Sequence, residues 1–396
     1  MEFEIVDNNN FPMHTSKYLS IPQKNSSSNA MGAVNKKKAV LVTYKDVFAS
    51  KEAVGLAEAA GYEVTEVVFQ GYIKHGGLGL GPGVAERIKN KASISNFETI
   101  IIDAALTSSQ IHQLGQITGL AVIDRDKLIL DIFESRATTG EAKLQVKLAE
   151  LTYELPRVRQ TVRLSKKGER QGSMGLGEYA VDVQFRSLKK QMSSIKEKLL
   201  QVQKRRSLYR TQRQRLNIPF VSLVGYTGSG KTTLFNRMSE EEKEVANNLF
   251  TTLGTTTRTV ILPDYSKILL SDTVGFITRI PTYMIEAFKS TLDELFYADL
   301  VLLMVDASEP SNEVAIKYYR CLDILNELRV PTSKVLVVLN KSDKSSEKEL
   351  ADAKELIGDL PSIVISAKHG AGTRSLKNRI RESLKARLEA KILSPR

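Results

Sequence analysis

The chain has 396 residues, of which 42% are hydrophobic, and it carries a formal net charge of +12. This length predicts two or three domains, and the apolar share is ample for packed cores. Cys321 is the only cysteine, which excludes a disulfide framework and favours a reducing cytoplasm. No apolar run approaches the ~18 residues of a membrane span, so stable membrane insertion is not expected. The four histidines are scattered, without metal-ligand spacing.

The first part of the chain predicts a tail followed by a small domain. Residues 1–38 are polar and rich in Asn and Ser, which is typical of a disordered tail, and Met31 is an alternative natural start. Residues 39–134 alternate strand and helix patterns, which predicts an α/β domain with a parallel sheet. The expected strands are Ala39–Thr43, Val64–Phe69, Thr99–Asp103 and Ala121–Asp124, and the expected helices lie near 51–60, 83–91 and 107–118.

Residues 135–217 predict an antiparallel helical hairpin. Two apolar stripes recur at helical spacing, and a Gly-rich, basic stretch from Pro156 to Gly177 separates them as a mobile tip. The first stripe is Leu144, Leu148, Leu151 and Leu155, and the second is Phe185, Leu188, Met192, Ile195, Leu199 and Val202.

The second of these helices is strongly basic. Residues 186–215 hold eleven Lys or Arg and one acid, Glu197, which amounts to +10 of the formal +12. A solvated helix normally mixes both signs, so a polyanion partner is favoured over an ordinary coiled coil. With no base-reading motif, this pattern suits structured RNA recognised by shape and phosphates, with affinity falling steeply as salt rises. The charge extends toward the tip through Arg157, Arg159, Arg163, Lys166, Lys167 and Arg170.

Residues 218–396 begin with a phosphate-binding pattern. A short apolar strand runs into Gly225-x-x-x-x-Gly230-Lys231-Thr232, and a helix pattern follows. This spacing wraps backbone N–H groups around a triphosphate, with Lys231 on the phosphates and the Thr232 hydroxyl on Mg²⁺. The alternative is an ordinary Gly-rich turn. The candidate contacts are Gly225, Tyr226, Thr227, Gly228, Ser229, Gly230, Lys231, Thr232 and Thr233.

Two later strand ends select the base. Val335–Leu339 is an apolar run that ends in Asn340, Lys341, Ser342 and Asp343, and a second run ends in Ser366, Ala367 and Lys368. The Asp343 carboxylate can accept two N–H bonds from guanine, a donor pair that adenine lacks. Single strings of this kind are common surface turns, but two of them in this order after a phosphate loop predict GTP.

A third motif lies between these two. Asp272, Thr273, Val274 and Gly275 follow another apolar run, which places Asp272 to hold Mg²⁺ and the Gly275 N–H to sense the γ-phosphate. Phe276 stands where many GTPases carry a Gln that orients water. A phenyl ring cannot orient water, so the intrinsic rate should be low, around 10⁻⁴ to 10⁻² per second.

The first switch is less determined. The segment Phe250, Thr251, Thr252, Leu253 and Gly254 offers hydroxyls that could close over Mg²⁺ and the γ-phosphate. We favour Thr252, with Thr256 and Thr257 as alternatives. A Thr-rich edge strand or turn explains the remaining threonines.

These motifs together resemble the HflX family of translational GTPases, of the Obg-HflX group. The resemblance covers nearly everything from residue 39 onward, and it rests on Gly225–Asn236, Leu249–Leu253, Asp272–Ile277, Glu286–Leu292, Ala298–Ser308 and the upstream Val122–Arg125, Leu128–Phe133 and Gly140–Val146. It implies an α/β fold: a P-loop GTPase domain preceded by a small parallel-sheet α/β domain and an antiparallel helical hairpin. It also implies Thr252 as the Mg²⁺-linked switch residue.

Three departures from the family pattern qualify this resemblance. Gly228 replaces the family's usual Asn, so stimulation by K⁺ is not expected. Gly254-Thr255 replaces an Asp-Pro, which leaves the switch loop less constrained. The N-terminal Gly79–Val84 segment lacks the Lys that the family links to a second nucleotide site, and an ordinary loop is favoured over ATP binding there.

The expected protein is a cytoplasmic, monomeric, Mg²⁺-dependent GTPase. The resemblance implies catalysis by Lys231, Thr252 and Gly275, binding to the large ribosomal subunit and its rRNA, and rescue or splitting of stalled ribosomes. The alternatives are a GTP-dependent regulator of another RNA or a membrane, and an RNA-remodelling ATPase centred on the N-terminal domain. A short helix, Leu376–Ile392, is expected to close the chain.

Overall fold

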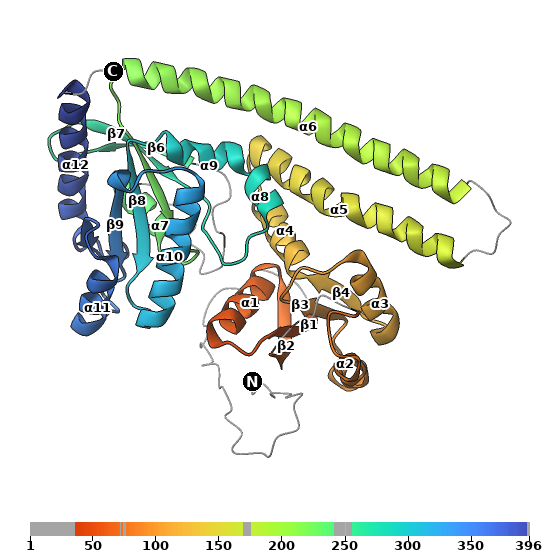
Figure 1. Ribbon diagram of the computed structural model, residues 1–396. Helices are drawn as coiled ribbons and strands as arrows, with labels where there is room; N and C mark the ends of the chain where they lie inside the picture. Colours follow the sequence, from red (N-terminus) through yellow and green to blue (C-terminus); the bar gives the residue numbers. More distant parts are fainter. Residues whose placement is uncertain are drawn as a thin grey trace. The chain divides into compact units, whose positions relative to one another are not determined.

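The fold is that of a computed structural model that describes residues 36–71, 73, 77–168, 176–240, 250 and 256–393. The chain divides into two compact units. The first unit is Met1–Ser135 with Ala149–Ser193, and the second is Arg136–Leu148 with Ser194–Arg396. Two long helices, α5 (Gly140–Gly168) and α6 (Leu176–Arg215), therefore contribute residues to both units (Figure 1). Apart from its last three residues, the predicted tail 1–38 lies outside the described residues.

The first unit is built on a four-stranded parallel sheet in the order β2-β1-β3-β4. Its central strands β1 and β3 are largely buried, as in parallel sheets covered by crossover helices, whereas the edge strand β4 is partly exposed. The predicted strands are present, and the first two extend one or two residues further at each end. The strands are β1 (Lys37–Tyr44), β2 (Tyr62–Gln70), β3 (Thr99–Ile102) and β4 (Ala121–Asp124).

The helices α1 (Val47–Ala59), α2 (Pro82–Ser95) and α3 (Ser108–Thr118) connect these strands. The first starts four residues before the predicted 51–60, because the Asp46 side chain accepts a hydrogen bond from the Ala49 N–H at 2.6 Å and caps the helix there. In α3 the Thr107 side chain and Gln110 form a capping box, which fixes the start where it was expected.

A fourth helix, α4 (Arg125–Arg136), follows β4 directly and was not among the predicted helices. Residues 128–133 are apolar except for Asp131, so they do not show the one-sided apolar stripe of an ordinary surface helix. The missed signal is Asp124, whose carboxylate accepts a hydrogen bond from the Lys127 N–H at 2.9 Å, as an N-cap residue does.

The basic tip of the predicted hairpin is shorter than expected. The stretch from Pro156 to Gly177 was expected to be a loop, but α5 continues through Pro156 to Gly168 and α6 begins at Leu176. Proline at that position removes one helical N–H, a local loss that contacts elsewhere can offset. Arg157, the next residue, supplies such contacts through Asp124 and the Leu106 carbonyl oxygen. The antiparallel pairing is confirmed by an ion pair between Arg206 and Glu141, at 2.6 Å.

The second unit contains a six-stranded sheet in the order β10-β9-β8-β5-β7-β6, in which only the pairing of β6 with β7 is antiparallel. The carboxyl ends of the five parallel strands thus meet at one edge, where open α/β sheets bind ligands. The strands are β5 (Phe220–Gly225), β6 (Thr256–Ile261), β7 (Lys267–Asp272), β8 (Leu300–Asp306), β9 (Val335–Asn340) and β10 (Ser362–Val364).

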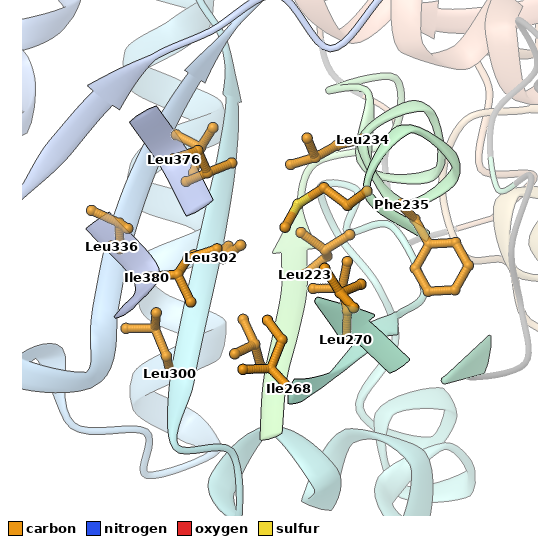
Figure 2. Packing of buried hydrophobic residues seen from close by; sticks show 14 of the residues in the cluster. Leu223, Leu234, Phe235, Ile268, Leu270, Leu300, Leu302, Leu336, Leu376 and Ile380 are labelled. Carbon is orange, nitrogen blue, oxygen red and sulfur yellow. The ribbon is translucent and has the colours of Figure 1, made fainter. Parts of the chain in front are cut away.

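Helices cover this sheet and close its core. Figure 2 shows Leu223, Leu270 and Leu302 of three adjacent strands among side chains from α7 and α12, and all three are fully buried. The last helix, α12, begins three residues before the predicted Leu376 and ends one after the predicted Ile392. The helices are α7 (Lys231–Ser239), α8 (Thr282–Ala287), α9 (Lys289–Phe296), α10 (Ser311–Glu327), α11 (Glu347–Ile357) and α12 (Thr373–Leu393), with a 3₁₀ turn at Thr332–Lys334.

Candidate functional site

The predicted phosphate loop joins the central strand β5 to the N-terminus of α7. Every residue of β5 is buried between β7 and β8, so the loop leaves the sheet from its middle. Lys231 and Thr232 open α7 and are nearly buried, and Thr233 is partly buried behind them. The loop therefore presents backbone N–H groups at a helix N-terminus, which is the geometry that binds phosphate.

Two glycines of the loop are required by their surroundings. Gly225 has φ 148°, and a Cβ there would lie 2.4 Å from the Met304 carbonyl oxygen of β8. Gly230 has φ 93°, and a Cβ there would lie 2.2 Å from Nδ2 of Asn340. Both positions combine a left-handed backbone with a close approach, so any side chain would push the loop off the sheet. Gly228 also has a positive φ, 79°, but faces open space.

The Lys231 side chain curls back over the loop. Its Nζ donates to the carbonyl oxygens of Gly225 at 3.0 Å and Tyr226 at 2.8 Å. Burial lowers the pKa of this ammonium to about 8, against an opposing influence of the Asp272 carboxylate. The lysine is therefore a charge held at a desolvated position, where an anionic ligand would restore a strong Coulomb partner.

A hydroxyl and a carboxylate meet beside the lysine. The Thr232 hydroxyl donates to Oδ2 of Asp272 at 2.9 Å, and Asp272, at the end of β7, is fully buried. Next to it, the Thr273 hydroxyl donates to the Leu223 carbonyl oxygen at 2.7 Å and fixes the start of the following segment on β5. The structure thus brings together two of the three residues predicted as metal ligands.

The segment after Asp272 is paired with the phosphate loop. The Phe276 N–H donates to the Gly225 carbonyl at 3.0 Å, and the Thr227 N–H donates to the Phe276 carbonyl at 2.8 Å. Gly275 lies so close to the loop that a Cβ would be 2.8 Å from the Thr227 methyl group and 3.1 Å from Lys231 Nζ. Val274 and Phe276 are buried beside it. This contact requires glycine at position 275 and uses one N–H of the phosphate loop.

Asn340, at the end of β9, connects three of the predicted motifs. Its Nδ2 donates to the Ser229 carbonyl oxygen at 2.8 Å, and its Oδ1 accepts from the Ala367 N–H at 2.9 Å. The side chain is 2% exposed, so both bonds are protected from water. Asn340 therefore holds the phosphate loop and the Ser366–Lys368 turn at a fixed separation.

The predicted base-reading carboxylate is held in place and remains accessible. Ser366 donates its hydroxyl to Oδ1 of Asp343 at 2.5 Å, and this bond lowers the pKa of Asp343 below its usual range. The neighbouring Lys341 has φ 66° and forms an ion pair with Asp306 at the end of β8. The Ser342 N–H donates to the Ile365 carbonyl at 3.2 Å. An ionised, oriented carboxylate at this place can accept hydrogen bonds from a base.

Several residues of the site were not predicted from the sequence. Arg237 of α7 donates to the Lys368 and Ala367 carbonyl oxygens, and His369 lies with Nε2 3.6 Å from Oδ2 of Asp343. The Tyr226 hydroxyl accepts a hydrogen bond from the Thr278 N–H at 2.9 Å. The only available signal was adjacency for His369, which directly follows a predicted motif; the partners of the other two are distant in sequence.

The predicted first switch falls mostly outside the described residues. This applies to Thr251, Thr252, Leu253 and Gly254. Phe250 is described and is 2% exposed. The two alternative threonines, Thr256 and Thr257, begin the edge strand β6, with Thr256 opposite Asp272 in the antiparallel register.

The amino-acid sequence is similar to those of known proteins. Three family models match in succession: a GTP-binding GTPase N-terminal region at residues 49–134, a GTP-binding GTPase middle region at 136–213 and a 50S ribosome-binding GTPase at 220–341. A curated GTPase HflX from Thermococcus kodakarensis is 39% identical over 305 residues, which span 77% of this chain and 69% of that protein. The chain belongs to the HflX family of GTPases. The resemblance inferred from the motifs is thereby confirmed, and with it the assignment as a GTP-binding GTP hydrolase.

Further relatives agree with this membership. GTPase HflX of Methanocaldococcus jannaschii is 41% identical over 77% of this chain and 75% of its own length, and that of Hyperthermus butylicus is 36% identical over 83% and 91%. A solved structure of the GTP-binding protein SsGBP in complex with GDP has a TM-score of 0.52 at 27% identity, covering 89% of this chain and 99% of that chain. The predicted fold class, a P-loop GTPase domain after a parallel-sheet α/β domain and a helical hairpin, is confirmed.

Proposed function

We propose that this HflX GTPase binds the large ribosomal subunit through the basic hairpin and rescues or splits stalled ribosomes. The observation that carries the proposal is the one-sided charge of α6, which has eleven Lys or Arg and one acid between residues 186 and 215. Eight of the eleven are exposed, namely Arg186, Lys189, Lys190, Lys196, Lys198, Lys204, Arg205 and Arg215. A row of exposed cations of one sign suits a phosphate backbone.

The bound nucleotide, GTP or GDP, would determine the conformation of the segments around the nucleotide site. In this proposal Lys231 contacts the phosphate oxygens, the Gly275 N–H senses the γ-phosphate and Asp343 reads guanine, with Asn340 fixing the separation of the two ends. Because Gly275 and Phe276 are packed on the phosphate loop, a bound γ-phosphate would have to displace them. GTP and GDP would then favour different arrangements of this segment.

Magnesium fits the donor set that the structure brings together. Thr232 and Asp272 offer a hydroxyl and a carboxylate at 2.9 Å from each other, and hard oxygen donors of this kind suit Mg²⁺. We propose these two, with Thr252 of the first switch, as the metal ligands. The ion would neutralise charge on the phosphates during hydrolysis.

Sedimentation tests the ribosomal partner. The protein loaded with a non-hydrolysable GTP analogue is expected to travel with isolated large subunits at moderate salt, and GTP turnover is expected to rise when the subunits are added. Free rRNA and anionic liposomes form the other two arms. If turnover rises with liposomes and not with large subunits, a membrane-associated switch replaces the ribosomal proposal.

A matched pair of variants separates the hairpin from general charge. Lys190→Gln with Lys198→Gln removes two exposed cations of α6, whereas Lys348→Gln with Lys354→Gln removes two exposed cations of α11. The first pair should weaken binding and reduce the slope of log affinity against log salt by about two. Equal effects of both pairs would contradict a role for α6.

Among the described residues, no helix combines the length and the hydropathy that crossing a bilayer needs.

A further inference from the structure

A groove in the second unit lies between the C-terminal end of α6 and the outer strands β7 and β6. It encloses about 390 Å³, within the range of small-ligand pockets. No residue of the phosphate loop or of the base motif lines it, although Thr257, an alternative candidate for the first switch, does. Four apolar residues form one part of its lining, namely Leu216, Ile218, Phe220 and Leu269, and polar or charged side chains form the rest.

One wall of the groove is a row of arginines. Arg206, Arg210 and Arg213 recur at spacings of four and three, so they share one face of α6. The first two have carboxylate partners, Glu141 at 2.6 Å and Glu294 at 3.9 Å.

Arg213 differs from its two neighbours on that face. Its guanidinium lies 4.2 Å from the centre of the Phe220 ring, and among the described residues no carboxylate is within ion-pair distance of it. Arg213 is thus a cation on an aromatic face with donors left for an anion.

The floor of the groove carries a hydroxyl group without a partner. Ser271 of β7 lines the groove and is 1% exposed, and its hydroxyl has no hydrogen-bond partner among the described residues. Thr257, opposite it on β6, also lines the groove. Buried hydroxyls without partners are rare in folded proteins, so the Ser271 hydroxyl points to a group that completes it.

We propose that this groove binds a nucleotide unit, that is, a planar base carrying a phosphate. Arg213 would pair with the phosphate, since a guanidinium presents parallel donors that match phosphate oxygens. Tyr209, 70% exposed at the groove, offers an aromatic face on which a base can stack. The Ser271 hydroxyl would then bond to the edge of the base. Inorganic phosphate alone would leave the apolar lining and this hydroxyl unused.

The same unit can come from two sources, a free nucleotide or one nucleotide of an RNA strand. The inference does not depend on the ribosomal proposal, because the groove can be tested with no ribosome present. Conversely, a failure of the protein to sediment with large subunits would not contradict nucleotide binding in the groove.

The test uses the full chain saturated with GDP, so that the phosphate loop is occupied. The probes are AMP, followed by calorimetry, and 5′-fluorescein-labelled hexauridylate, followed by anisotropy. Arg213→Gln is expected to weaken binding of either probe about tenfold, the usual loss of a charge-assisted hydrogen bond. Arg374→Gln is the matched control, because it removes the same charge from an exposed position on α12, outside the basic helix α6, and it should change binding less than about twofold.

Ser271→Ala provides a second variant that does not alter charge. It should weaken binding of the probe about fivefold and leave the melting temperature of the ligand-free protein unchanged or raised, because it deletes a hydroxyl that has no partner. Binding of AMP identifies a free nucleotide as a sufficient ligand, and binding of hexauridylate alone identifies an RNA strand. The proposal is overturned if neither probe binds, or if Arg213→Gln and Arg374→Gln weaken binding equally.

Discussion

Strand β3 of the first sheet and strands β5 and β9 of the second lead from a buried apolar run into the carboxyl edge. Strand β4 of the first sheet, whose apolar residues are only partly buried, also ends there in a polar residue, Asp124. In the first sheet the polar groups at this edge satisfy one another. Asp103 accepts from the Thr43 hydroxyl at 2.8 Å and pairs with Arg125 at 2.5 Å, and Arg125 also pairs with Glu52 at 2.7 Å. All four side chains are buried.

The carboxylate of Asp124, in the same sheet, also has all its hydrogen bonds within the protein. Its two oxygens accept from the Leu106 and Lys127 N–H groups, the Tyr153 hydroxyl and the Arg157 guanidinium, at 2.8 to 3.1 Å. At the edge of the second sheet, by contrast, Gly225 and Gly230 let the phosphate loop lie close against β8 and Asn340, and Asp343 keeps a partly exposed carboxylate. Polar residues after parallel strands therefore mark a ligand site only where their donors and acceptors are not already used by other groups of the protein.

The largest change in nucleotide affinity is expected from a substitution at Asp343. If Asp343 reads guanine as proposed, Asp343→Asn would place an amide donor opposite the guanine 2-amino group, so affinity for GDP should fall about 10³-fold or more. Xanthine carries an oxygen at that position, and the variant should bind XDP more tightly than GDP. Calorimetric titration of both nucleotides measures this inversion.

Asp124→Asn is the matched control in the first sheet. It should leave affinity for GDP within about twofold and lower the melting temperature instead, since Arg157 and Tyr153 lose their carboxylate partner. If Asp343→Asn bound GDP as the wild type does, Asp343 would have to be withdrawn as the reader of the base.

The next effect concerns Arg125. Burial alone would lower the pKa of this guanidinium, but the Asp103 and Glu52 carboxylates outweigh burial and raise it. Arg125→Met leaves the two carboxylates buried without their cation, which should cost about 3–5 kcal/mol of unfolding free energy at pH 7. Affinity for GDP should not change, because the nucleotide motifs lie on the other sheet.

The pH dependence of this loss gives a sharper readout. Without the cation, the folded-state pKa of one carboxylate rises above its unfolded value, so its protonation favours the fold as pH falls. The stability difference between Arg125→Met and the wild type should therefore shrink between pH 7 and pH 5. Urea unfolding at the two pH values measures it, and a constant difference would show that lost packing, not charge, dominates.

The sequence predicted those parts of the site in which a chemical role fixes the spacing of neighbouring residues. Gly225, Gly230 and Lys231 belong to one loop, and the structure gives each a conformation or contact that only that residue type provides. Their spacing was readable because a phosphate loop has a fixed length.

Contacts between segments that are distant in the sequence could not be predicted from such local patterns. Nothing near Asn340 announces that its amide bonds to Ser229, 111 positions away, and nothing near Arg237 announces Lys368. The extension of α5 past Pro156 has the same origin, since Arg157 is tied to Asp124 of another element. Proline is a local signal for a helix end, and tertiary contacts override it here.

The smallest effect is expected at Lys231, a buried cation at the edge of the second sheet that a bound phosphate would pair with. Its pKa of about 8 lies below the ordinary value because burial disfavours the charge. A bound phosphate would raise that pKa, so binding is coupled to proton uptake above pH 8. Affinity for GDP should therefore fall about tenfold between pH 7 and pH 9, as the lysine of the free protein loses its proton.

Titration of a fluorescent GDP derivative at a series of pH values checks this slope. Lys231→Met should bind more weakly at pH 7 and show no corresponding fall toward pH 9, because the titrating group is gone. Arg125, which is equally buried but already paired with two carboxylates, supplies no such dependence, since its protonation does not change in this range. A flat profile in the wild type would mean that Lys231 stays fully charged without a phosphate, and that its carbonyl partners at Gly225 and Tyr226 are enough to hold the proton.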